Sequence, residues 1–187
     1  MKVFERAVRR ADIPIAMSKG FNPHPKLSIL LALSVGIAGR DEVLELELLS
    51  PIPSEILVER LGQQLPKEIH ILSVESIPHT ANSAVRDIIY EVVFKDQSLL
   101  KTLQPGKFLQ QSSILVNRTK NGCQKPFDIR PSIQEIIIQP NGLMLTIQMM
   151  SEGMARPEEV LDALCINRKK ELFDITRTKI NLSSSAK

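Results

Sequence analysis

Side chains that could exchange a proton or hold an anion alternate in the segment Asn22-Pro23-His24-Pro25-Lys26. In extended backbone, residues two apart point to the same side, so Asn22, His24 and Lys26 would share one face. An imidazole between an amide and an ammonium group can bind a phosphate or act as an acid–base group near neutral pH. No serine, cysteine or carboxylate at a fixed spacing completes a catalytic set. His24 is a weak candidate for catalysis on this pattern, and a hydrogen-bonding role is the alternative.

The loop that carries these residues is stiffened by its prolines. Pro23 and Pro25 fix φ at two alternate positions, and Gly20 permits a positive φ. A stiff loop has little conformational entropy left to lose on binding. We therefore predict a binding loop, against the alternative of a proline-rich connector with incidental polar residues. Its candidate binding residues are Lys19, Phe21, Asn22, His24 and Lys26.

Basic charge is concentrated at the start of the chain. Residues 1–30 contain six basic and two acidic residues, whereas residues 41–60 contain one basic and six acidic residues. Arg9 and Arg10 add to the basic loop as candidate binding residues. Such a patch suits phosphate contacts with nucleic acid, which are salt-dependent and independent of sequence. The alternative is a solvated helix face whose charges serve solubility.

A second basic group surrounds the turn signal Asn121-Gly122. Its candidate binding residues are Arg118, Lys120 and Arg130, with Lys125 nearby and with Arg156 and Arg177 brought close by the fold. Guanidinium groups bind phosphate and carboxylate bidentately, so this group could recognise either anion. The alternative is a salt-bridged hairpin, in which Asp128 pairs with Arg130.

Composition restricts the chemistry further. The 187-residue chain is 43% hydrophobic and 4% aromatic, with a net charge of +3, so its core must be aliphatic and a broad surface of stacking rings is disfavoured. Cys123 and Cys165 lie far apart and form no CxxC motif, which excludes a cluster or zinc site built from thiolates alone. We expect no metal and no cofactor. Two distant cysteines are typical of reduced cytosolic thiols, so we expect a cytoplasmic protein. The apolar runs are too short to span a bilayer, and no membrane partner is expected.

The first half of the chain carries one helix pattern at its start and mainly strand patterns after it. Apolar residues at 3, 4, 7, 8 and 11 predict a helix over residues 1–11. Because no strand precedes this helix, we expect that Met1 is an internal methionine of a longer protein and that a leading strand is missing. We further predict an edge strand at 13–17, strands at 27–33, 43–49 and 69–77, a helix from Ser54 to about residue 64, and turns at Gly36 and at 39–41.

The second half repeats this order. We predict strands at 87–94, 114–118 and 173–182, a hairpin of 133–138 with 143–149, and helices at 98–103 and 157–164. Both halves follow the split βαβ order. The predicted fold is α+β, with two tandem ferredoxin-like units and antiparallel sheets, the first unit missing its leading strand. The predicted domains are residues 1–80 and 84–182, joined by a linker and followed by a disordered tail at 183–187.

Several segments resemble a known family. They are Phe4–Ala11, Lys19–Ser28, Asp128–Pro131, Arg156–Leu161 and Thr176–Lys179. These segments are similar to the radical-SAM-linked protein family, domain of unknown function 2344, and the glycine–proline segment is their most specific part. Members occur beside, or fused to, cobalamin-binding radical-SAM enzymes, so the resemblance implies a radical-SAM protein as partner. It also implies a strand and a loop ahead of the first helix.

The sequence favours a non-catalytic accessory module that works with a radical-SAM enzyme and binds RNA or another anionic substrate. One alternative is a metal-independent RNA-processing enzyme that uses His24, by analogy with the tandem ferredoxin-like endonucleases of CRISPR systems. A further alternative is a structural protein-interaction domain that docks a partner through the acidic strand around Glu45 and Glu47. The sequence makes no prediction of the oligomeric state.

Overall fold

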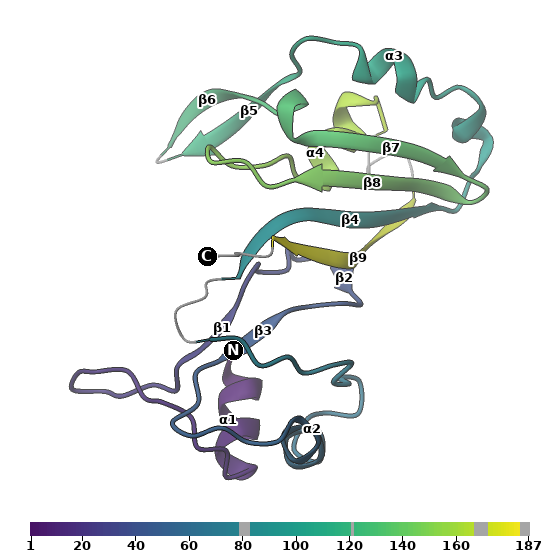
Figure 1. The fold of residues 1–187 in the computed structure, drawn as a ribbon. Helices are drawn as coiled ribbons and strands as arrows, with labels where there is room; N and C mark the ends of the chain where they lie inside the picture. Colours follow the sequence, from purple (N-terminus) through teal and green to yellow (C-terminus); the bar gives the residue numbers. More distant parts are fainter. Residues whose placement is uncertain (79–82, 121, 167–171, 184–187) are drawn as a thin grey trace. The chain divides into compact units, whose positions relative to one another are not determined.

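The apolar patterns of the sequence produce two separate units in the computed structural model of this chain (Figure 1). The structure describes residues 1–78, 83–120, 122–166 and 172–183, without the side chain of Lys120. The first unit contains residues 1–32 and 42–84, and the second contains residues 33–41 and 85–183. Helices and strands mix in both units, so the predicted α+β class is confirmed. The domain boundaries at 80 and 84 stay a prediction.

The first unit is built around an amphipathic helix, α1 (Lys2–Arg10). Its apolar stripe buries Ala7 and Val8 completely, as the helical spacing predicts. The other elements are β1 (Leu27–Ile29), β3 (Leu44–Leu46) and α2 (Ser54–Gly62). Strands β1 and β3 form an antiparallel pair, and the core joins residues of α1, α2 and the segment after α1: Ala7, Val8, Ala11, Ile13, Leu57 and Leu61.

All four strand predictions for the first unit need correction, and the strand predicted at 43–49 covers only Leu44–Leu46. Residues 13–17 form only isolated bridges, one of them between Ile15 and Leu48, because Pro14 has no N–H to continue a ladder. The strand that begins at Leu27 ends at Ile29 instead of Leu33. Residues 69–77, all described, form no strand. Their apolar side chains Ile71 and Val74 pack on the core without backbone pairing.

The second unit contains a five-stranded sheet in the order β2-β9-β4-β8-β7. Its strands are β2 (Ile37–Gly39), β4 (Ala84–Phe94), β7 (Ile133–Gln139), β8 (Gly142–Gln148) and β9 (Phe173–Ser183). The pairs β4–β8 and β7–β8 are antiparallel, which confirms the predicted hairpin. The order β9-β4-β8-β7 is compatible with a split βαβ arrangement, and the ferredoxin-like description of the two halves stays a prediction.

Strand β2 was not predicted, because Gly36 before it and Gly39 at its end suggested only turns. Gly36 does lie in a turn with φ of +85°, but Gly39 ends a strand that pairs parallel with β9. Ser183, predicted as the first residue of the tail, instead ends β9. Residues 184–187 of the predicted tail and residues 79–82 around the predicted linker lie outside the described residues.

The remaining elements of the second unit are short. They are the 3₁₀ helices η1 (Ser98–Lys101) and η2 (Arg130–Ser132), the helices α3 (Pro105–Leu109) and α4 (Pro157–Ala163), and the hairpin of β5 (Leu115–Lys120) with β6 (Cys123–Asp128). Of the turn predicted between β5 and β6, Asn121 lies outside the described residues and Gly122 has φ of +79°.

One face of β4 is apolar and buried, and the other is partly polar and carries a candidate site. Ile88, Tyr90 and Val92 point into the core and are at most 3% exposed. Strand geometry places the alternate residues, such as Asp87 and Ile89, on the opposite face. That opposite face of the sheet is partly polar.

Candidate functional site

The glycine–proline loop of the first unit is closed by two hydrogen bonds across its base. The Ser18 N–H donates to the His24 carbonyl at 2.8 Å, and the His24 N–H donates to Ser18 Oγ at 2.9 Å. Gly20 has φ of +135°, which favours glycine there. Residues 19–22 bend, and His24 and Lys26 lie after this bend. The loop is held at its base and presents its tip.

The tip presents the side chains that the sequence singled out. Lys19, Asn22 and His24 are exposed, and Phe21 is 107% exposed, the highest value among the exposed large hydrophobic residues. Lys26 instead forms an ion pair with Glu47 Oε1 at 2.7 Å, so its charge is partly balanced. A fully exposed ring on a restrained loop is the informative feature, because large apolar side chains normally avoid water.

The two arginines predicted on the first helix have different surroundings. Arg9 is exposed at the end of α1. Arg10 donates from Nη2 to the Gln64 carbonyl at 2.8 Å, just after α2. Arg10 therefore helps to tie the two helices together, while Arg9 presents a positive charge at the surface.

In the second unit, Arg118 and Arg156 meet at one carboxylate. Arg118 donates from Nε and Nη2 to the two oxygens of Glu159 at 2.8 and 2.6 Å, and also to the Met154 carbonyl. Its guanidinium carbon lies 3.7 Å from the centre of the Phe127 ring. The Arg156 N–H donates to Glu159 at 2.8 Å, which caps α4. This cluster fastens the β5–β6 hairpin to α4.

The other predicted basic residues do not join this cluster. Arg130 donates to the Leu109 carbonyl at 2.6 and 3.0 Å and to the Ile133 carbonyl at 2.8 Å. The predicted Asp128 pairing occurs through backbone, since Asp128 accepts the Arg130 N–H at 3.0 Å. Arg177 is 1% exposed within β9, and the Lys120 side chain lies outside the described residues. The fold therefore does not gather these arginines into one basic surface.

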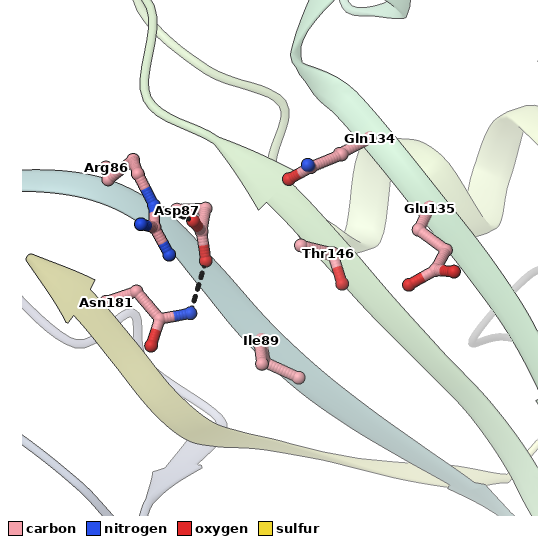
Figure 2. A pocket seen from close by; sticks show the side chains of 7 residues that line it. All are labelled: Arg86, Asp87, Ile89, Gln134, Glu135, Thr146 and Asn181. Atoms are coloured by element: carbon pink, nitrogen blue, oxygen red, sulfur yellow. Dashed lines mark hydrogen bonds and ion pairs between the residues drawn. The ribbon is translucent and has the colours of Figure 1, made fainter.

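A polar hollow of about 360 Å³ lies on the sheet of the second unit (Figure 2). It is lined by Arg86, Asp87, Ile89, Gln134, Glu135, Thr146 and Asn181. Asp87, only 6% exposed, accepts hydrogen bonds from Arg86 Nε at 2.6 Å and from Asn181 Nδ2 at 2.5 Å. This site was not predicted from the sequence. The one available signal was a carboxylate beside the apolar run that follows it in β4.

The ionisation of Asp87 is tied to these contacts. Burial raises the pKa of Asp87, but the hydrogen bonds from Asn181 and Arg86 outweigh that effect, so the pKa is lowered overall. A carboxylate with a lowered folded-state pKa stabilises the fold above its unfolded pKa, and this stabilisation is lost as pH falls through the folded value.

We expect Asp87→Asn to lower the free energy of unfolding by about 2 kcal/mol at pH 7, because charged hydrogen bonds are lost. Below about pH 4, the ordinary range of an aspartate, the difference from the wild type should shrink. Urea unfolding between pH 7 and pH 3 measures both effects. Asp174→Asn, at an exposed aspartate of β9, is the control. A difference that stays constant over this pH range would contradict the assigned role.

Two further properties of the described residues concern membranes and metals. None of their helices is long and apolar enough to cross a bilayer. They contain no group of three or more histidine, cysteine, aspartate or glutamate residues placed to hold a metal ion.

The fold and these sites define an α+β protein of two units, one with an exposed, restrained loop and the other with a polar hollow on its sheet. A family model described as "Uncharacterized protein conserved in bacteria (DUF2344)" matches residues 1–159, and the chain belongs to that family. No curated protein and no solved structure matches the chain.

Proposed function

We propose that this chain is a non-catalytic cytoplasmic module that binds RNA in association with a radical-SAM enzyme. The observation that carries the RNA-binding part is the fully exposed Phe21 on a loop closed between Ser18 and His24. Bases stack on exposed aromatic rings, and cationic side chains such as Lys19 contact the phosphates. The radical-SAM partnership is supported by the resemblance of the sequence motifs, and the cytoplasmic location by two free cysteines.

A single exposed ring is suited to stacking on one base of an RNA strand. It does not form the row of stacking rings that would hold many bases at once. One stacked base contributes about 1–3 kcal/mol, which is enough to anchor a strand at one position. Arg9 adds a positive charge to the same unit, whereas Lys26 is engaged with Glu47. Phe21 therefore makes the main contact with the RNA, and Lys19, on the same loop, contacts a phosphate.

We expect Phe21→Ala to weaken binding of a short single-stranded RNA by about tenfold, since one stacking contact is lost. Lys19→Ala should weaken binding less and reduce the slope of log affinity against log salt by about 0.7. Fluorescence anisotropy of a labelled RNA over a salt series measures both. Leu72→Ala and Lys67→Ala are matched controls at exposed positions of the same unit, and both should bind as the wild type does.

Other outcomes would favour the alternatives. Absence of RNA binding at low salt, or unchanged binding by Phe21→Ala, would overturn the proposal and leave a protein-interaction domain. Metal-independent cleavage of the RNA that is lost in His24→Ala would instead support the RNA-processing enzyme. Co-purification from native cells tests the partnership, which requires a cobalamin-binding radical-SAM protein among the captured proteins.

A further inference from the structure

The polar hollow of the second unit is separate from the loop to which RNA binding is assigned. Six of its seven lining residues are polar or charged, and Ile89 supplies the one apolar side chain. The hollow contains one guanidinium and two carboxylates, so the way these charges are already used decides which ligand it fits.

The carboxylate of Asp87 serves to position Arg86. It accepts one hydrogen bond on each oxygen, from Arg86 Nε and from Asn181 Nδ2. The Arg86 side chain is 60% exposed, and the bond through Nε leaves its two terminal nitrogens for a ligand. A guanidinium fixed by a buried carboxylate is well suited to bind an incoming carboxylate bidentately.

The second carboxylate, Glu135, lies across the hollow from Arg86 (Figure 2). It is exposed and forms no ion pair with any residue that the structure describes. Glu135 lies in register with Thr146, which pairs with Ile89. Two strand spacings and two residues along the strand then separate the Cα atoms of Asp87 and Glu135 by about 12 Å.

We propose that this hollow binds a short peptide through its two charged ends. The C-terminal carboxylate would bind Arg86, and the N-terminal ammonium would bind Glu135. Thr146, on β8 between β4 and β7, and Gln134, beside Glu135 on β7, can hydrogen-bond the peptide groups. A chain of three residues spans about 10 Å, which is close to the separation of about 12 Å between the Cα atoms of Asp87 and Glu135, whereas a single amino acid is much shorter.

The charge balance of the hollow favours such a zwitterion over a simple anion. With Asp87 used to hold Arg86, one cation and one anion remain for the ligand. A phosphate at Arg86 would leave the Glu135 carboxylate without a cationic partner from the ligand, whereas the ammonium group of a zwitterion supplies one.

Isothermal titration of the full chain with trialanine tests the proposal. We expect saturable binding of trialanine, and binding weaker by about tenfold or more for N-acetylated trialanine amide, which lacks both charges. Alanine should bind at least as weakly as the blocked peptide. Inorganic phosphate should not displace the peptide. Equal binding of free and blocked peptide, or displacement by phosphate, would overturn the proposal, as would no binding of trialanine.

Two variants locate the site. Glu135→Gln, at an exposed position, should weaken trialanine binding by about tenfold without affecting folding. Arg86→Lys keeps a positive charge beside Asp87 but loses the bidentate geometry, and should also weaken binding. Glu152→Gln, at another exposed glutamate of the second unit, should bind as the wild type does. Fluorescence of Tyr90, the single tyrosine, verifies that each variant is folded. Wild-type affinity in both site variants would overturn the assignment.

Discussion

Replacing Gly142 by alanine should destabilise the second unit severely, by about 3 kcal/mol. A Cβ at this position would lie 1.7 Å from the Val92 carbonyl oxygen and 2.8 Å from the Val92 carbonyl carbon. Both atoms belong to the backbone of β4, which pairs with β8 at this point through Val93 and Gly142. Backbone in the centre of a sheet cannot rotate away as a flexible side chain could. The methyl group would therefore force β8 away from β4.

The measurement is urea unfolding followed by tyrosine fluorescence. Tyr90 is the only tyrosine, the chain has no tryptophan, and Tyr90 is 3% exposed in β4, so the signal reports the second unit alone. Gly106→Ala is the matched control, since a Cβ at that position would have no heavy atom within 4 Å and α3 favours alanine by up to about 1 kcal/mol. A Gly142→Ala protein that unfolds within about 0.5 kcal/mol of the wild type would contradict the close approach of the strands.

Local patterns were sufficient to predict elements of both units. The turn residues Pro140-Asn141-Gly142 between two apolar runs are typical of a hairpin, and the predicted β7–β8 hairpin is confirmed. The spacing of apolar residues in α1 likewise gave the helix and its core side. In each case, the residues that decide the structure lie within a few positions of one another.

The failures concern pairing between distant residues. Residues 69–77 have apolar side chains like those of a strand. Two of these side chains, Ile71 and Val74, are partly buried by packing on the core, although their backbone forms no strand. Strand β2 has only three residues, two of which are small, and forms by pairing with β9 from the other end of the chain. No local pattern specifies either outcome, because both depend on which partner the tertiary fold supplies.

The same limit applies to the candidate sites. The exposed loop was found because its glycine, prolines and polar residues are contiguous. The hollow was missed because it depends on a hydrogen bond between Asp87 and Asn181, which are 94 positions apart. Arg118 was identified as a basic residue, but its carboxylate partner Glu159 was not, because 41 positions separate them.

Replacing Arg118 by alanine should cost the second unit about 3 kcal/mol at neutral pH, since it breaks a mostly buried ion pair. The side chains of Arg118 and Glu159 are 22% and 16% exposed. The variant loses both hydrogen bonds to Glu159, the bond to the Met154 carbonyl and the contact with the Phe127 ring. It leaves Glu159 with the Arg156 N–H as its remaining hydrogen bond among the described residues.

The pH dependence separates the ion pair from simple loss of packing. Burial raises the pKa of Glu159, but the hydrogen bonds from Arg118 and from the Arg156 backbone lower it overall. The pair therefore stabilises the fold above the unfolded pKa of glutamate, about 4.3, and this contribution is lost as pH falls through the folded value. The difference in free energy of unfolding between wild type and Arg118→Ala should become smaller as the pH falls from 7 to 3, measured by Tyr90 fluorescence in urea.

Lys125→Ala, at an exposed neighbour of Arg118, should cost less than about 0.5 kcal/mol at either pH. A cost for Arg118→Ala that is equally large at pH 3 would assign the effect to the Phe127 contact and the Met154 hydrogen bond, because neither depends on the charge of Glu159.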